Sequence, residues 1–141
     1  MAQPEPNSTA TRRSRNIEGT ETVLVVEDDP AVREYASHVL KSRGYKLLDA
    51  SNGVEAIAIV EQKLDAVDII VTDVKMPEMG GVELARRLRD QRGDVKVLFM
   101  SGYVGAEFMV EESVGPNSDF VQQPFAPAVL CAKVRALLDA P

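Results

Sequence analysis

The sequence predicts an α/β fold in which a parallel β-sheet is covered by helices on both faces. Three observations support this prediction. Short runs rich in β-branched residues alternate with stretches of helical periodicity, the run at 68–72 is almost continuously apolar, and polar residues follow the ends of several runs. Such alternation is typical of crossover units and a mainly parallel sheet, and a strand buried on both faces reads as continuously apolar.

Length and composition indicate one domain and exclude several functions. The chain has 141 residues, 45% of them hydrophobic, and a formal net charge of −6. Nucleic acid and anionic membranes would be repelled by that charge, so we expect neither as a partner. No run approaches the roughly 18 apolar residues of a membrane span, and a secretory signal is absent. With Cys131 as the single cysteine, no internal disulfide is expected and a cytoplasmic location is predicted.

The first residues of the chain differ in composition from the rest. Residues 1–20 are polar and proline-containing, with almost no large apolar side chains. Such a segment cannot bury enough apolar surface to offset the entropy lost on ordering. We therefore expect a flexible tail over 1–20 and a single domain over 21–141.

Five rounds of strand and helix are expected after the tail. The strands are predicted at 22–27, 46–50, 68–72, 95–100 and 119–122, and the helices after Asp29, after Gly53, and over 81–91, 106–113 and 126–140. Asp29 is expected to cap the first helix, with Pro30 in its first turn and Gly44 at its end. The helices are expected to turn apolar faces inward, among them the side chains of Tyr35, Val54, Ala58 and Val129, whereas His38 falls off such a face.

Acidic residues stand where two of these strands end. Glu27, Asp28 and Asp29 come at the end of the first strand, and Asp73 follows the third. The carboxyl ends of parallel strands open onto one rim, so Glu27, Asp28 and Asp73 are expected to meet there. Converging carboxylates repel one another unless a cation or a proton relieves them. Mg²⁺, which prefers oxygen ligands, is the expected ion. Taken singly, each acid also fits a helix cap or a turn.

Four segments together resemble the receiver domain of two-component response regulators. They are Val25 to Pro30, Asp73 to Gly81, Phe99 to Tyr103, and the pair Pro124-Phe125. The resemblance covers about residues 22–139, and the Phe-Met-Ser-Gly-Tyr segment is similar to receivers attached to hybrid sensor histidine kinases. It implies a doubly wound, five-stranded parallel sheet of order 2-1-3-4-5, with two helices on one face and three on the other.

The resemblance also implies a role for each residue of the site. Asp73 would be the phosphoacceptor, Asp28 a direct Mg²⁺ ligand, and Glu27 a ligand through metal-bound water. The main-chain carbonyl of Lys75 would complete the protein ligands, and Ser101 would donate its hydroxyl to the incoming phosphoryl group. The donor would be a sensor histidine kinase or a histidine phosphotransfer protein. No enzymatic activity is expected beyond assistance to the domain's own phosphorylation and dephosphorylation.

One residue departs from the family pattern. The familiar receiver has lysine immediately before the Pro-Phe pair, where this chain has Gln123. A neutral amide donates hydrogen bonds but does not neutralise charge, and a charge-assisted bond contributes roughly 1.5 to 3 kcal/mol. Transfer or coupling is therefore expected to be weaker by about tenfold to a hundredfold or somewhat more. One hypothesis is that the ammonium of Lys75 partly substitutes; the alternative is that Lys75 faces solvent.

The resemblance further implies a switch that joins Ser101 to the aromatic residue of the fifth strand, Phe120. Alternatively, Phe120 is a core residue. The surface formed by 106–113, 119–122 and 126–140 is expected to bind a downstream protein or to form a homodimer.

Other functional classes remain as alternatives. A pseudo-receiver would be a constitutive interaction module in which Gln123 marks lost phosphorylation. A Mg²⁺-dependent phosphohydrolase would need a second acid where Lys75 stands. A flavodoxin-like cofactor protein would need a phosphate-binding loop after the first strand, and none is present there.

Overall fold

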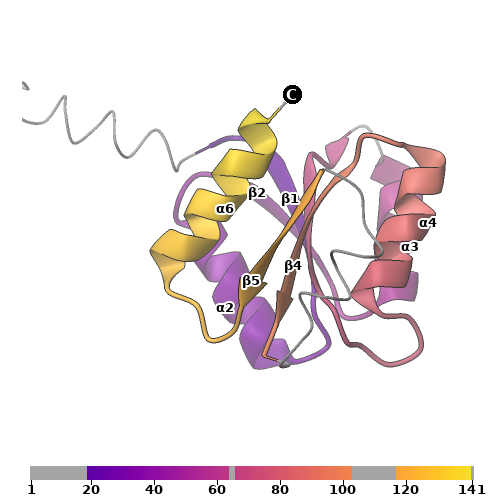
Figure 1. The fold of residues 1–141 in the computed structure, drawn as a ribbon, viewed down its shortest axis with the longest axis horizontal. Coiled ribbons are helices and arrows are strands. Elements are labelled where there is room, and N and C mark those ends of the chain that lie inside the picture. Colours follow the sequence, from indigo (N-terminus) through magenta and orange to yellow (C-terminus); the bar gives the residue numbers. More distant parts are fainter. Residues whose placement is uncertain (1–18, 64–65, 103–116, 141) are drawn as a thin grey trace, which may run out of the picture.

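Five parallel strands form the centre of the molecule, as predicted (Figure 1). The computed structural model describes residues 19–63, 66–102 and 117–140. Its elements are β1 (Thr22–Val26), α2 (Pro30–Lys41), β2 (Lys46–Ala50), α3 (Gly53–Lys63), β3 (Ile69–Asp73), α4 (Gly81–Gln91), β4 (Lys96–Ser101), β5 (Ser118–Gln122) and α6 (Pro127–Asp139). The strand order is β2-β1-β3-β4-β5, which confirms the predicted sheet. The helix expected over 106–113 lies outside the described residues.

Each strand supplies alternate side chains to two hydrophobic cores, as a pleated strand buried on both faces must. In β1, for example, Val23 and Val25 face one core while Leu24 and Val26 face the other. Helices α3 and α4 cover the core that contains Leu24, and helices α2 and α6 cover the core that contains Val23 (Figure 1). The sheet is therefore enclosed by helices on both faces, and its strand ends open onto the rim.

Two strands extend one residue further toward the rim than the sequence predicted. Asp73 and Ser101 are the last residues of β3 and β4 because pairing continues through them, Asp73 opposite Met100 and Ser101 opposite Gln122. Glu27 directly follows β1. The polar residues expected at the rim are thus held by the ends of the strands themselves.

The predicted boundaries of the first helix are confirmed. The carboxylate of Asp29 accepts a hydrogen bond of 2.9 Å from the Ala31 N–H, and Pro30 stands in the first turn. Gly44 has a φ of +99°, a left-handed conformation that an L side chain rarely adopts, and it follows the end of α2. His38 is exposed, as expected.

Several predicted core residues are exposed instead. The exposed fractions of Tyr35, Val54 and Val129 are 42%, 58% and 44%, and Ala58 is exposed as well. The buried stripe of α3 consists of Gly53, Ala56 and Val60, and that of α6 of Leu130, Cys131, Val134 and Leu137. Because a helix on a sheet buries only a narrow stripe, apolar residues one position away from it face solvent.

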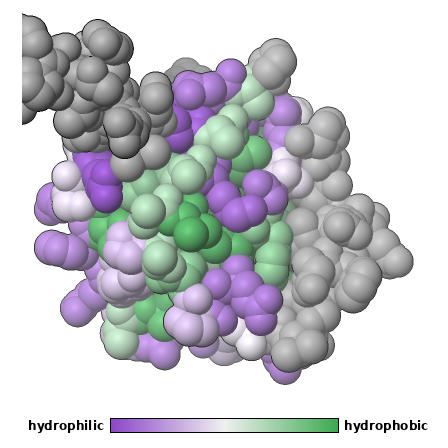
Figure 2. Space-filling view, turned by 60° about the vertical axis from the view of Figure 1, so that its left-hand side comes forward, coloured by the Kyte–Doolittle hydropathy of each residue, from purple (hydrophilic) through white to green (hydrophobic). Residues whose placement is uncertain are grey.

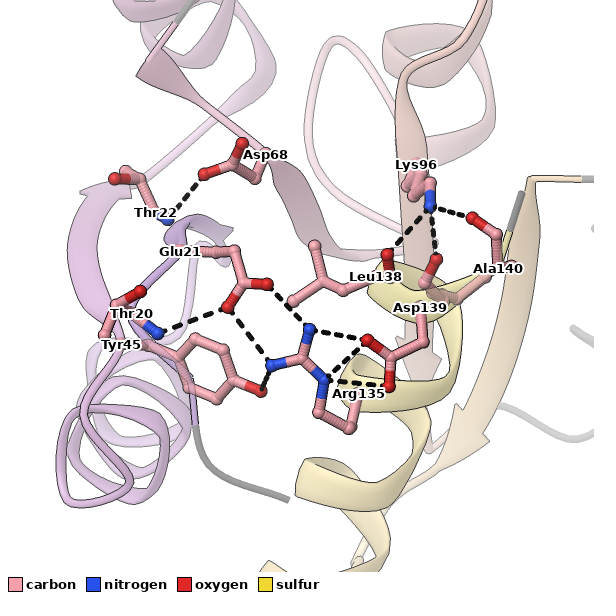
Figure 3. A network of polar contacts seen from close by, with 11 residues as sticks. Thr20, Glu21, Thr22, Tyr45, Asp68, Lys96, Arg135, Leu138, Asp139 and Ala140 are labelled. Carbon is pink, nitrogen blue, oxygen red and sulfur yellow. Dashed lines mark hydrogen bonds and ion pairs between the residues drawn. The ribbon is translucent and has the colours of Figure 1, made fainter. Parts of the chain in front are cut away.

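A network of polar contacts holds the end of α6 at the amino-terminal ends of the strands (Figure 3). This network, here called the clasp, consists of Glu21, Lys96, Arg135 and Asp139 with the carbonyl groups at the end of α6. The guanidinium of Arg135 contacts Glu21 at 2.6 Å and Asp139 at 2.9 Å. Hydrogen bonding to Glu21 raises the pKa of Arg135 further. The Lys96 ammonium donates to three carbonyl oxygens at the end of α6 over 2.6 to 3.1 Å. The clasp ties the last helix to Glu21, the residue before β1, and to Lys96, the first residue of β4.

None of the helices in the described part of the chain is long and apolar enough to span a membrane.

Candidate functional site

Three carboxylates converge at the rim, as the sequence predicted. Glu27, Asp28 and Asp73 each place one oxygen within 4.8 Å of the others. The convergence follows from the sheet order, since β1 and β3 are neighbours and Val26 pairs with Thr72. Glu27, which follows Val26, and Asp73, which follows Thr72, therefore lie side by side. Among the described residues, no other group of acids, histidines or cysteines comes together in this way.

Glu27 is the most deeply buried of the three acids, with only 2% of its surface exposed. Its Oε2 accepts a hydrogen bond of 3.1 Å from the Asp29 N–H, whereas its Oε1 has no partner in the described parts of the chain. Burial raises the pKa of Glu27 to about 8, with further contributions from Asp28 and Asp73, although the Asp29 N–H acts in the opposite direction. A proton or a cation would complete the surroundings of this carboxylate.

Asp73 is half-buried, and the backbone N–H groups of the residues that follow it lie near its carboxylate. Burial raises the pKa of Asp73, and the negative charge of Asp28 adds to the effect. The neighbouring Glu27 carboxyl and the backbone N–H groups of Lys75 and Val74 favour the ionised form of Asp73 and oppose this rise in pKa. Asp28 itself is exposed, so solvent and ligands reach the site from its side.

The segment after Asp73 folds closely over the end of β3. The Gly81 N–H donates to the Val74 carbonyl over 2.8 Å, and a Cβ at Gly81 would collide with the main-chain oxygen of Asp73. Met76 and Met79 are buried in the core under α3 and α4. Lys75 is exposed. Glycine at position 81 thus permits the start of α4 to lie against the main chain of Asp73, the candidate acceptor.

Ser101 and Gln123 stand on neighbouring strand ends at the same rim. Ser101 is buried, and its carbonyl oxygen accepts a hydrogen bond of 2.8 Å from the Gln123 N–H. The side-chain Nε2 of Gln123 is buried and has no partner among residues 19–63, 66–102 and 117–140. An amide donor is therefore held at the position where the family has lysine, without a protein acceptor within the described chain.

Phe120 is half-buried and packs against the core under α3 and α4, opposite Phe99 in the ladder. This packing fits the core interpretation of Phe120. The switch role stays a prediction, because it concerns a change between two states.

Two contacts near the site were not predicted from the sequence. Arg33 donates from Nη1 to the Glu27 carbonyl oxygen over 2.7 Å, which braces the turn between β1 and α2. Tyr35 donates its hydroxyl to the Phe125 carbonyl over 3.1 Å, and the two rings lie 5.7 Å apart. Tyr35, Phe125 and Gln123 line a groove of about 550 Å³ beside the rim. The helical periodicity of Tyr35 indicated burial, so no local signal marked it as a groove residue.

The fold and the acidic rim are those of a signalling receiver, and comparison with known proteins identifies the family. Residues 23–135 match the family model of the response regulator receiver domain, and the chain belongs to this family. The sensor kinase CckA of Brucella abortus (strain 2308) is 39% identical over 127 residues, which are 90% of this chain and 13% of CckA. The response regulator MprA of Mycobacterium leprae (strain TN) is 36% identical over 116 residues, 82% of this chain and 50% of MprA.

Solved structures agree with this assignment. The crystal structure of the receiver domain from the hybrid histidine kinase CckA has 32% sequence identity and a TM-score of 0.71, covering 84% of this chain and 99% of that one. The crystal structure of a putative response regulator from Chloroflexus aurantiacus J-10-fl has 29% sequence identity and a TM-score of 0.78, and the match covers 86% of this chain and 100% of that one. The similarity to receivers of hybrid kinases is confirmed.

The chain spans at most half the length of the curated relatives described above. What it shares with them is the receiver domain, a regulatory module of two-component signalling that works with histidine kinases or phosphotransfer proteins.

Proposed function

We propose that this domain accepts a phosphoryl group on Asp73 from a phosphohistidine of a sensor histidine kinase or a histidine phosphotransfer protein, in a Mg²⁺-dependent step of a phosphorelay. Phosphorylation then changes the binding of a downstream protein. The observation that carries the proposal is the convergence of Glu27, Asp28 and Asp73 within 4.8 Å at the rim. Membership of the receiver family supports it.

The residues present fit a magnesium ion. All three acids offer hard oxygen ligands, and the buried Oε1 of Glu27 is left without a partner in the described chain. Asp28 and Asp73 would hold the ion directly, Glu27 through water, and Lys75 through its main-chain carbonyl. When bound, Mg²⁺ neutralises the charge that gathers on the transferring phosphoryl oxygens.

The chain's own residues position the acceptor. A carboxylate is a weak nucleophile, so transfer to it depends on placement and on fixed hydrogen-bond donors. The backbone N–H of Lys75 orients the Asp73 carboxylate, whereas that of Val74 donates to the Met100 carbonyl oxygen and ties the end of β3 to β4. A carboxylate oxygen of Asp73 forms a bond to phosphorus, the phosphorus–nitrogen bond of the phosphohistidine breaks, and its electron pair stays on the imidazole. Ser101 and the amide of Gln123 donate to the phosphoryl oxygens.

A second candidate function rests on Gln123. The neutral amide does not supply the positive charge of the usual lysine, which favours a pseudo-receiver that binds its partner constitutively. In that case the acids would still lie together, but Asp73 would not be labelled. The two candidates therefore differ in one measurable reaction.

Phosphorylation by acetyl phosphate separates them. The full chain is incubated with this small phosphodonor, with Mg²⁺ or with EDTA, and its intact mass is measured. We expect the addition of one phosphoryl group that requires Mg²⁺, is removed by hydroxylamine, and is lost in Asp73→Asn. Asp90→Asn, an exposed aspartate on α4, is the matched control and should be labelled normally. Absence of labelling under all conditions would favour the pseudo-receiver.

Further expectations from the sequence remain proposals. These are the tail over 1–20, the cytoplasmic location, the partial substitution by Lys75, the Ser101–Phe120 switch and the downstream-binding surface that includes β5 and α6.

A further inference from the structure

β2 forms an open edge of the sheet. The Lys46 N–H donates to the Glu21 carbonyl over 3.0 Å, and the Ala50 carbonyl accepts from the Glu27 N–H over 3.1 Å. Since bonding to one neighbour involves alternate residues in a parallel ladder, the main-chain groups of Leu47 and Asp49 point away from β1. β2 ends the sheet of the described chain, so these groups are open to pairing.

A groove of about 600 Å³ runs along this edge between α2, β2 and α3. Leu47 and Leu48 of β2 and Ile59 of α3 supply its apolar part and are only partly buried. Ser37 of α2 also lines it, and the buried hydroxyl of Ser37 has no partner in the described residues. The edge therefore offers apolar contact together with unused hydrogen-bonding groups.

Charge is distributed unevenly along the groove. Glu34 and Asp49 line its end near the carboxyl end of β2, and Lys41 lines the opposite end. Lys46, the exposed first residue of β2, lies at the same end as Lys41 because α2 runs antiparallel to the strand that follows it. One end of this edge is thus acidic and the other is basic.

We propose that a second copy of this chain docks on this edge by antiparallel pairing of β2 with β2. A two-fold axis at Leu48 places Leu47 opposite Asp49 of the second copy, and the reverse, so that the main-chain groups that point outward pair with each other. The same axis brings the acidic end of one groove to the basic end of the other. Glu34 then faces Lys41 of the second copy, and the two Ser37 residues lie near the axis.

Helix positions agree with this arrangement. α2 packs against both β1 and β2, so two copies of α2 would lie about two strand spacings apart, roughly 9.5 Å, within the usual distance of packed helices.

On α3, Glu55 and Lys63 lie one turn before and one turn after Ile59, so α3 repeats the charge pattern of α2, with an acid at one end and a base at the other. Parallel docking would instead place like charges together. The charged residues of this edge therefore favour one orientation.

The proposed interface lies at the opposite end of the sheet from β5, and it includes none of the three acids of the rim. It therefore differs from the surface on which self-association was expected from the sequence.

Sedimentation velocity of the full chain over a range of concentrations tests the proposal. We expect a reversible dimer. Glu34→Lys and Lys41→Glu should each weaken it about tenfold or more, because each change turns two symmetry-related attractions into repulsions. The double variant Glu34→Lys/Lys41→Glu should restore it, since the reversed pairs are complementary again. Asp90→Lys and Arg86→Glu make the same charge changes on exposed positions of α4 and should leave the dimer unchanged.

Amide hydrogen exchange of the unmodified protein provides a second measurement that needs no variant. The N–H groups of Leu47 and Asp49 should exchange more slowly as concentration rises. A chain that stays monomeric up to about a millimolar overturns the proposal. A dimer with the same dissociation constant in both single variants also overturns it, as does a double variant that stays as weak as the single ones. Exchange at Leu47 and Asp49 that is independent of concentration would do the same.

Discussion

Gln123 donates its backbone N–H to the carbonyl oxygen of Ser101 over 2.8 Å, which joins the ends of β5 and β4 at the acidic rim. The contact involves only main-chain atoms, so it holds position 123 in place whatever side chain stands there. The side-chain Nε2 of Gln123 is buried without a partner among the described residues. A longer, charged side chain at this position would keep the anchor and supply the positive charge that glutamine does not.

Replacing Gln123 by lysine is expected to raise the rate of phosphorylation. The ammonium would provide a charge-assisted bond to the phosphoryl oxygens, so Gln123→Lys should react with acetyl phosphate about tenfold to a hundredfold faster. The time course of the intact mass measures the rate. Gln122→Lys, on the exposed neighbouring residue of β5, adds the same charge and should change little. Equal rates for both variants would contradict the role assigned to position 123.

The contribution of Lys75 is a separate prediction. If its ammonium substitutes for the missing lysine, Lys75→Ala should slow phosphorylation, and the loss should be smaller in a background that already carries Gln123→Lys. The same mass assay measures both rates. An unchanged rate in Lys75→Ala would leave Lys75 with only its main-chain role.

Two adjacent aspartates should differ in their effect on magnesium binding. Asp28 contributes an oxygen to the acidic cluster, whereas Asp29 caps α2 through its hydrogen bond to the Ala31 N–H. We expect Asp28→Asn to weaken Mg²⁺ binding at least tenfold, because a charged ligand becomes neutral. Asp29→Asn should bind normally, since asparagine caps a helix about as well as aspartate. Isothermal titration of each variant checks this, and similar losses in both would argue against the assigned ligand set.

The metal-free protein should lose stability as pH rises. Burial, aided by Asp28 and Asp73, raises the pKa of Glu27 from its ordinary 4.5 to about 8. Between these values the folded protein holds a proton that the unfolded chain has released, so the free energy of unfolding falls with increasing pH. Thermal unfolding in EDTA between pH 5 and 9 should therefore show a decreasing Tm. Mg²⁺ added at pH 8 should restore it.

Glu27→Gln isolates the residue responsible for this pH dependence. The amide does not ionise, so most of the slope should disappear, and the part that remains belongs to Asp73, whose pKa is also raised. Glu61→Gln, at an exposed position of α3, should keep the full slope. An unaltered slope in Glu27→Gln would show that another group titrates.

The clasp on α6 should contribute measurably to stability. The Arg135 side chain is only 13% exposed and contacts Glu21 and Asp139. Arg135→Ala leaves Glu21 partly buried without its partner, and we expect a loss of about 2 kcal/mol in the free energy of unfolding. Arg87→Ala removes an ion pair with Glu83 in which the arginine is 56% exposed, and should cost about 0.5 kcal/mol or less. Urea denaturation distinguishes the two, and equal losses would contradict the special role of the clasp.

Much of the fold was predictable because strand and helix patterns are local properties of the chain. β2 and α4 have the boundaries expected from periodicity and from glycines. The acids were recognisable because Glu27, Asp28 and Asp73 stand where runs of apolar residues end. To predict that these acids lie close together, the order of the strands was also needed. The family resemblance supplied that order, and the observed sheet confirms it.

The sequence by itself determined the parallel sheet and the identity of the acids at its rim, because strand periodicity and chain direction place the residue after each strand at the same edge. Only the tertiary structure decided which apolar residues are exposed and which long-range contacts form. Whether Val129 is buried depends on the rotation of α6 against the sheet. The contact between Arg135 and Glu21 joins residues 114 positions apart, and no local pattern specifies such a pair.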